Sequence, residues 1–362
     1  MVVYVLLQRK YTARIMFVTL FSYYFYYKSS GTYFFLLAIV TVADFFLAQL
    51  MDRVEGYWKR KGLVALSLGV NLGLLAYFKY TNFLGGVIAS LMGGEFTALD
   101  IFLPVGISFF TFQTMSYTVD VYRQDAPAQR NMVSFGAYVT MFPQLVAGPI
   151  VRYKDVAAEL VLRTNTASEF AAGARRFTVG LAKKVLLANS IGALWDAELA
   201  AQSAGMLTAV GGWLGIAAFG FQIYFDFSGY SDMAIGMGQM LGFHFPENFN
   251  YPYTAASVTE FWRRWHISLT TWFREYLYIP LGGSRKGTWR TVRNIFLVWF
   301  CTGFWHGASW NFILWGLHFF AWLMLEKYLL RDFLQKLPSW LRHFYTLVVV
   351  FVGWGVFAME NL

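Results

Sequence analysis

Residues 33–50 read YFFLLAIVTVADFFLAQL, an apolar run with a single charged side chain, Asp44. A helix of about twenty such residues crosses the hydrocarbon core of a bilayer, so the run predicts a membrane span. Similar runs recur along the chain, which predicts an all-α polytopic membrane protein. We expect spans near residues 15–27, 33–50, 63–78, 101–119, 133–147, 175–195, 205–225, 230–243, 292–306, 308–329 and 343–358.

The composition of the whole chain supports this interpretation. Of the 362 residues, 57% are hydrophobic, 20% are aromatic and only 14% are charged. These proportions exclude a soluble globular domain, a disordered chain, a collagen-like chain and a nucleic-acid-binding module. The net charge of +9 comes from short basic clusters between apolar runs, such as Lys59, Arg60 and Lys61. Such clusters are typical of cytoplasmic anchors, so the partner they indicate is the lipid bilayer.

Several kinds of chemistry have no residues to support them. The chain has one cysteine, Cys301, inside an apolar run, so neither a disulfide framework nor a thiolate metal site is expected. It has no His-Glu-x-x-His motif, no G-x-S-x-G elbow and no Walker loop. We expect no metal site and no bound cofactor.

A different kind of segment follows residue 243. The stretch HFPENFNYPY (His244–Tyr253) is rich in turn residues, and its two prolines cannot continue a helix. Residues 258–281 then mix aromatic and charged side chains, which is typical of an interfacial or re-entrant helix. The closing GGSRKG (282–287) predicts a flexible basic turn on the cytoplasmic side.

His306 is the most conspicuous polar residue in an apolar setting. It lies in CTGFWHGASWN (301–311), with Gly307 leaving room beside the ring for a substrate. Burial disfavours the charged imidazole, so the ring would stay neutral and able to accept a proton. The alternative is a histidine that only hydrogen-bonds a neighbouring helix.

His266 lies in EFWRRWH (260–266). On a continuous helix, Trp262 and Arg263 lie one turn before it on nearly the same face. One interpretation is an amphipathic helix anchored at the membrane interface. The other is that two histidines, brought together by the fold, divide the work of base and substrate orienter.

The run FDFSGYSD (225–232) places two carboxylates and three hydroxyls between apolar stretches. It could line a polar cavity, orient an imidazole or cap a broken helix. We favour capping, because Ser and Asp are common at helix starts.

The sequence shows no internal repeat, and linker-like composition occurs only around residues 120–131 and 150–170. We therefore expect one membrane domain over residues 1–362. Small-residue spacings indicate close helix approach at Gly69 with Gly73 and at Gly303 with Gly307.

Six motifs occur in the order of a known family. Together they resemble the membrane-bound O-acyltransferase superfamily, and within it the bacterial alginate O-acetylase branch. They are LVAGPI (145–150), YFDFSGYSDMAIG (224–236), FPENFNYPY (245–253), FWRRWHISL (261–269), YLYIPLGGSRKG (276–287) and WHG (305–307).

The resemblance implies a bundle of about eleven helices, with interfacial or re-entrant helices around a central pocket. It also implies a multi-pass protein of the bacterial inner membrane that moves an acetyl group from a cytoplasmic donor, acetyl-CoA or another acyl thioester. The acceptor would be an exported polysaccharide (alginate, another exopolysaccharide or peptidoglycan) or a periplasmic or surface acetyltransferase partner. Relative to the family, the chain is expected to be truncated at its N-terminus and to lack C-terminal helices.

The resemblance makes His306 and His266 the catalytic residues. We expect His306 to act as general base, directly or through an acetyl-enzyme step, and His266 to orient the donor or stabilise the oxyanion. The residues expected to bind substrate are Trp305, Asn311, Trp262, Arg264 and Asp226. Those expected to bind the phosphates of the donor are Arg263, Arg285 and Lys286.

Three other functions fit the same residues. The first is D-alanyl transfer to teichoic acid, whose enzymes share the two histidines. The second is a proton-coupled transporter, which would show repeated halves. The third is a scaffold subunit of an acetylation complex without catalysis of its own.

Overall fold

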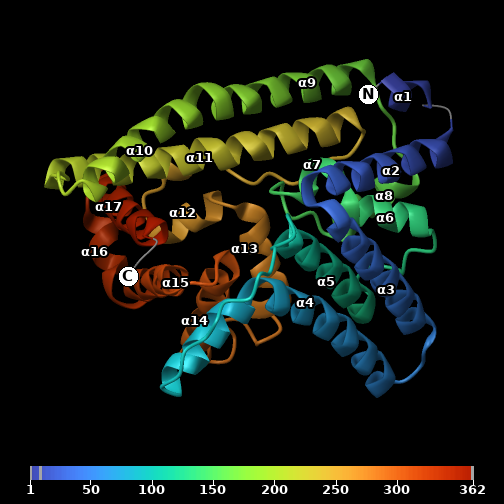
Figure 1. Cartoon of the computed structure of the whole chain (residues 1–362), viewed down its shortest axis with the longest axis horizontal. Coiled ribbons are helices and arrows are strands. Elements are labelled where there is room, and N and C mark those ends of the chain that lie inside the picture. The colour runs from blue at the N-terminus through green and yellow to red at the C-terminus, as the bar shows by residue number, and fades with distance from the viewer. Residues whose placement is uncertain (1, 8–9, 360–362) are drawn as a thin grey trace. The chain divides into compact units, whose positions relative to one another are not determined.

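The structure is a computed structural model that describes residues 2–7 and 10–359 (Figure 1). All regular secondary structure in these residues is helical. Five segments are long and apolar enough to cross a membrane: Tyr11–Arg53, Tyr57–Leu91, Ala167–Ser203, Trp310–Lys336 and Ser339–Ala358. The predicted all-α polytopic membrane fold is confirmed, although the outermost residues of the predicted domain, 1 and 360–362, lie outside the described part.

The chain divides into two compact units. The first contains the described residues up to Arg176 together with Ala234–Pro246, and the second contains Phe177–Met233 and the described residues from Glu247 onward. The single membrane domain therefore stays a prediction, and each unit is described by itself.

The helices before residue 183 are, in order, α1 (Val2–Leu6), α2 (Tyr11–Ser30), η1 (Gly31–Tyr33), α3 (Phe34–Arg53), α4 (Tyr57–Leu91), α5 (Ile107–Arg123), α6 (Met132–Thr140), α7 (Phe142–Leu145), α8 (Tyr153–Val161) and α9 (Ala167–Ala182). The later ones are η2 (Lys183–Ala188), α10 (Asn189–Ser203), α11 (Ala209–Met240), η3 (Pro252–Thr254), α12 (Val258–Arg264), α13 (Ile267–Phe273), η4 (Arg274–Tyr278), α14 (Thr288–His306), α15 (Trp310–Leu325), η5 (Glu326–Leu330), α16 (Arg331–Lys336) and α17 (Ser339–Ala358).

The first unit joins three of its helices through a buried polar cluster. Asp44 on α3 accepts hydrogen bonds from Ser67 Oγ at 2.6 Å and from Asn71 Nδ2 at 2.8 Å, both on α4. Thr114 on α5 donates to Asn71 Oδ1 at 2.7 Å. Polar groups at membrane depth need partners of this kind. The one charge in the run 33–50 is therefore part of a helix-packing contact.

The outer faces of the long helices carry apolar side chains. Leu20 is 63% exposed, Ile39 65% and Phe46 58%. A water-soluble protein rarely leaves large contiguous apolar patches uncovered. These faces are suited to contact with lipid chains.

Helix α11 corrects two expectations. The spans predicted at 205–225 and 230–243 form one continuous helix, Ala209–Met240, so the run 225–232 lies inside a helix and does not cap one. Its two carboxylates form ion pairs with lysines of η2, Asp226 with Lys184 and Asp232 with Lys183, each at 2.6 Å. These ion pairs neutralise the carboxylates without interrupting the backbone hydrogen bonds of α11.

Close helix approach is confirmed at Gly303, one of the predicted positions. A Cβ at Gly303 would overlap the carbonyl oxygen of Phe312, and one at Gly316 would overlap that of Trp299, so α14 and α15 pack backbone to backbone. At Gly69 and Gly73 a Cβ would meet no atom of the described residues within 4 Å. The prediction for Gly69 and Gly73 is wrong, because their side of α4 is open.

Candidate functional site

Helix α12 ends shortly before His266. Helix α12 ends at Arg264, Trp265 is extended, and His266 has a left-handed backbone with φ 44°. The expected continuous helix over 258–281 is therefore wrong, and Trp262 and Arg263 do not share a helical face with His266. A left-handed conformation is unusual for a residue with a side chain, so the surrounding structure must hold it.

Asn248 supplies much of that support. Its carbonyl oxygen accepts the Ile267 N–H at 2.9 Å, and its side-chain oxygen accepts the Ser268 N–H at 3.3 Å. These two N–H groups open α13 and have no partner within that helix. Two residues further on, the Asn250 N–H donates to the Arg264 carbonyl at 2.9 Å. The loop thus fixes both sides of the break.

The His266 imidazole is buried, and only one of its two ring nitrogens has a hydrogen-bond partner among the described residues. The residue is 2% exposed, and its Nδ1 lies 3.0 Å from Asn248 Oδ1. Among the described residues, Nε2 is buried without a hydrogen-bond partner. Desolvation by burial lowers the pKa of His266 to about 3, which keeps the ring neutral at physiological pH.

His306 is the last residue of α14, directly after Trp305, and the Trp305 ring lies near both His306 and His266. The Trp305 ring lies 6.3 Å from the His266 ring and 4.9 Å from the His306 ring, measured between centroids. Trp315 and Phe357 complete the surroundings of His306 at 4.9 and 5.4 Å. The fold thus places the two histidines on one tryptophan within the second unit.

The sequence suggested open space beside Gly307, but the structure shows that this space is filled. A Cβ there would overlap the Phe312 ring, which itself lies 4.9 Å from Phe357. Asn311 is 4% exposed and donates from Nδ2 to the Phe357 carbonyl at 2.9 Å. Asn311 therefore orients the Phe357 backbone, and Phe357 in turn contacts His306.

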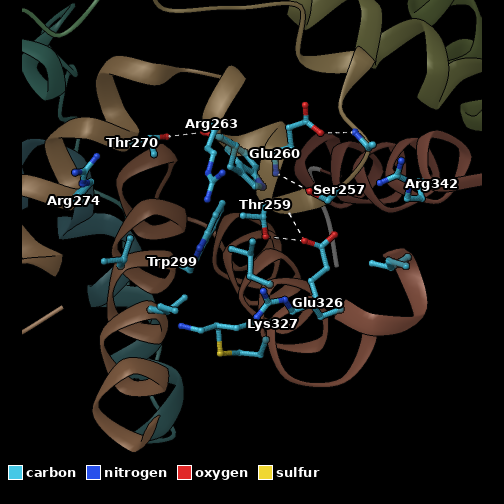
Figure 2. A pocket seen from close by; sticks show the side chains of 18 of the residues that line it. Ser257, Thr259, Glu260, Arg263, Thr270, Arg274, Trp299, Glu326, Lys327 and Arg342 are labelled. Carbon is cyan, nitrogen blue, oxygen red and sulfur yellow. Dashed lines mark hydrogen bonds between the residues drawn. The ribbon is translucent and has the colours of Figure 1, made fainter. Parts of the chain in front are cut away.

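A cavity of about 740 Å³ opens in the second unit, and Trp262 and Trp299 form part of its wall (Figure 2). Trp262 is also packed in the aromatic core, 4.7 Å from Trp299 and 4.8 Å from Phe319. The charged side chains that line the cavity are Glu260, Glu326, Arg263, Arg274, Lys327, Arg331 and Arg342.

Both acidic side chains in the cavity wall, Glu260 and Glu326, are already bound to other groups of the protein. Glu260 pairs with Arg264 at 2.6 Å, and the Ala256 N–H and the Arg264 guanidinium lower the pKa of Glu260. Glu326 accepts the N–H groups of Val258 and Thr259 at 2.6 and 2.9 Å. The five cations form no salt bridge with a described residue, so the cavity has the character of an anion site.

Glu326 holds α12 in place from the neighbouring π-helical turn η5. It is 6% exposed, and besides the two N–H groups it accepts the Thr259 hydroxyl at 2.7 Å. We expect Glu326→Gln to lower the free energy of unfolding by roughly 1.5–3 kcal/mol, because hydrogen bonds to a charged group are lost. Thermal unfolding of the detergent-solubilised protein measures the change.

The matched control for this prediction is Asp332→Asn. It removes the same charge from an exposed residue of α16, and surface changes cost about 0.5 kcal/mol or less. Equal stability of the two variants would show that Glu326 does not anchor α12.

The other predicted substrate-binding residues, Arg264 and Asp226, are paired with other side chains. Arg264 binds Glu260 and donates to Thr254 Oγ1 at 3.1 Å, and Asp226 is paired with Lys184. Of the three residues predicted to bind the donor, Arg263 lines the cavity. Arg285 and Lys286 lie on the exposed turn before α14 and do not line it.

Two contributors were missed in the sequence. Asn248 was interpreted as turn chemistry alone, and Glu326 had no motif that marked it. The spacing of Asn248 within the proline-rich loop could not indicate its partner, because the hydrogen bonds to Ile267 and Ser268 bring together segments about twenty residues apart.

These features define a polytopic membrane protein with one buried histidine, His266, and one half-buried histidine, His306, that both lie near Trp305, and with a cationic cavity. The chain belongs to the membrane-bound O-acyltransferase family, whose profile matches residues 107–362.

Relatives fall into three functional groups. The "Probable alginate O-acetylase AlgI" of Azotobacter vinelandii is 46% identical over 333 residues, covering 90% of this chain and 66% of the relative. The "Peptidoglycan O-acetyltransferase" of Helicobacter pylori is 36% identical over 352 residues, 89% of this chain and 66% of the relative. The "Teichoic acid D-alanyltransferase" of Bacillus subtilis is 28% identical over 279 residues, 68% of this chain and 69% of the relative. This chain spans slightly less than two thirds of the first two relatives.

Proposed function

We propose that this protein is a membrane O-acyltransferase that transfers an acetyl group from a thioester to a hydroxyl of a polysaccharide. The observation that carries the proposal is that His266 and His306 both lie against Trp305, in a chain 46% identical to an alginate O-acetylase. Acetyl is favoured over D-alanyl because the acetylase relatives are more similar than the D-alanyltransferase at 28%.

The chemistry needs a base. A hydroxyl oxygen attacks the thioester carbonyl, the new ester bond forms and the carbon–sulfur bond breaks. We assign the removal of the hydroxyl proton to His306, which returns the proton to the departing thiolate. Trp305, Trp315 and Phe357 surround the imidazole with apolar rings, so water has limited access and competes less well with the acceptor hydroxyl.

The cationic cavity is the proposed entry point of the donor. Its five cations suit the phosphates of acetyl-CoA or of a phosphopantetheine carrier. Basic residues gather on the cytoplasmic side of membrane proteins, so we place the cavity on that side of the bacterial inner membrane. The acceptor then lies on the opposite side, as an exported polysaccharide or a periplasmic acetyltransferase that completes the transfer.

Reversing a charge inside the cavity tests whether the donor binds there or at the basic turn, residues 282–287. We expect Arg274→Glu to raise the KM for the thioester by about tenfold or more, the effect of losing one charge-assisted hydrogen bond. The loss should shrink as ionic strength rises. Initial rates of acetyl transfer by the protein in proteoliposomes, at several donor concentrations, measure it.

Arg285→Glu is the comparison for Arg274→Glu. It makes the same change on the turn before α14 and should alter the KM less than about twofold, because Arg285 does not line the cavity. A larger effect from Arg285→Glu than from Arg274→Glu would move the donor site from the cavity to the turn.

The proposed activity is tested by ester analysis. The chain is expressed in a bacterium that lacks its own O-acetylase but exports the polysaccharide, and acetate and D-alanine released by mild alkali are both quantified. Acetate above the level of an empty-vector strain supports the proposal. D-alanine would favour the teichoic-acid activity, and neither ester would count against transfer by this chain.

A further inference from the structure

We infer that Asn248 is a positioning residue that holds His266 in the tautomer with its proton on Nδ1, so that Nε2 presents a lone pair to an O–H or N–H group of the substrate. The inference rests on the proposed acyl transfer and assigns a new residue to its site. It follows from the hydrogen bonds that surround the Asn248 amide.

The orientation of the Asn248 amide is fixed by its neighbours. Its Oδ1 lies 3.3 Å from the Ser268 backbone N–H, which can only donate, and 2.9 Å from Ser268 Oγ. On its other side, Nδ2 donates to Ser231 Oγ at 3.0 Å. Rotating the amide by 180° would put an NH₂ group against the Ser268 N–H. The atom facing His266 is therefore the oxygen.

An oxygen at this place selects the tautomer of His266. Asn248 Oδ1 has no hydrogen, so the 3.0 Å contact is a hydrogen bond only when Nδ1 carries the proton. A neutral imidazole then has none on Nε2. That nitrogen is buried and has no hydrogen-bond partner in the described residues, and a buried unpaired acceptor is costly. Binding of a substrate donor group would remove that cost.

This arrangement also narrows the role of His266. Stabilising an oxyanion requires a proton on Nε2, and the tautomer supplies none. An accepting Nε2 instead suits the orientation of a substrate hydroxyl or amide, while His306 takes the reacting proton. Asn248 itself is 0% exposed behind the imidazole, so it acts through His266 and not on the substrate.

The charged side chains on the helices around His266 form ion pairs with other residues or line the cavity. On α11, Asp226 and Asp232 pair with Lys184 and Lys183. On α12, Arg264 pairs with Glu260 and Arg263 lines the cavity. The rings that face the imidazole are Phe227 at 4.7 Å and Trp305 at 6.3 Å, and Trp305 also contacts His306. Burial is the one cause of the lowered pKa of His266.

The first experiment needs no enzymatic activity. The full chain is labelled with ¹⁵N-histidine in nanodiscs, and the signals of His266 are assigned by their loss in His266→Gln. We expect a protonated Nδ1 and an unprotonated Nε2, unchanged from pH 8 to pH 5. A proton on Nε2, or on both nitrogens in that range, would overturn the inference whether or not the chain transfers acetyl groups.

The second experiment uses Asn248→Asp. A carboxylate in place of the amide still accepts from Nδ1 but favours the charged imidazole. The pKa of His266, followed by the same ¹⁵N signals, should therefore rise by about one unit or more. The control is Asn250→Asp, the same change at an exposed residue of the same loop, which should leave the pKa of His266 unchanged.

The outcomes separate the two proposals. If the wild-type chain transfers acetyl groups but Asn248→Asp leaves the pKa of His266 unchanged, Asn248 is merely structural and the inference fails while the function stands. If the wild type transfers nothing, the proposed function fails, and the tautomer measured by NMR still decides the placement of His266.

Discussion

Replacing His306 with alanine is expected to reduce acetyl transfer by about 10²–10⁴-fold, the usual contribution of a general base. The imidazole contacts the aromatic rings of Trp305, Trp315 and Phe357. Its removal takes away the group proposed to accept the hydroxyl proton. Ester-linked acetate in the exported polysaccharide, normalised to the amount of membrane protein, measures the loss.

The control for this prediction is a second histidine in an apolar helix. His318 on α15 contacts the Val349 carbonyl through Nε2 at 3.0 Å and the Phe319 ring at 5.0 Å, so its interactions are with neighbouring helices. His318→Ala should reduce transfer less than about tenfold, a loss explained by packing alone.

The His306 variant also separates the rival functions. A proton-coupled transporter would lose flux of its cargo but would not form ester bonds by itself. A scaffold subunit would retain acetylation in His306→Ala, because its partner performs the chemistry. Unchanged acetylation in His306→Ala would show that His306 is not catalytic.

The second large effect is expected at the crossing of α14 and α15. In Gly303→Ala the new methyl group would overlap the Phe312 carbonyl oxygen, and the Gly316 Cα is only 3.3 Å away. Both neighbours are backbone atoms, so relief requires the helices to separate. We expect a loss of about 1–3 kcal/mol or more in the free energy of unfolding, together with loss of transfer because α14 carries His306. Denaturant titration of the solubilised protein measures the stability.

Gly69→Ala is the matched variant at an open position. A methyl group there meets no described atom within 4 Å, and alanine favours a helix over glycine by about 1 kcal/mol. Gly69→Ala should therefore be neutral or slightly stabilising. If both variants were equally stable, the close contact between α14 and α15 would not be what holds the pair together.

Part of the span pattern was predictable from the sequence. The helix predicted at 33–50 is found at Phe34–Arg53 and that at 343–358 at Ser339–Ala358. Their signal is local, because continuous apolar composition over about twenty residues is enough to favour a membrane helix. The run 225–232 was misinterpreted, since the lysines that neutralise its carboxylates come from another helix, some forty residues earlier.

The candidate site was predictable in its residue types but not in its geometry. The Trp305-His306-Gly307 motif pointed to His306. Nothing in the sequence indicated that Phe312 fills the space beside Gly307, or that the chain turns sharply at His266. That turn depends on Asn248, whose hydrogen bonds replace those that a continuous helix would make.

The sequence by itself therefore determined the membrane class, most of the helices and the two histidines. These follow from hydropathy and from motifs whose residues are close together in the chain. Only the tertiary structure decided that both imidazoles contact Trp305, that Arg263 joins a cationic cavity while Arg285 does not, and that Asn248 orients His266. The physical reason is that such contacts join groups distant in the chain, and their geometry depends on how whole helices pack.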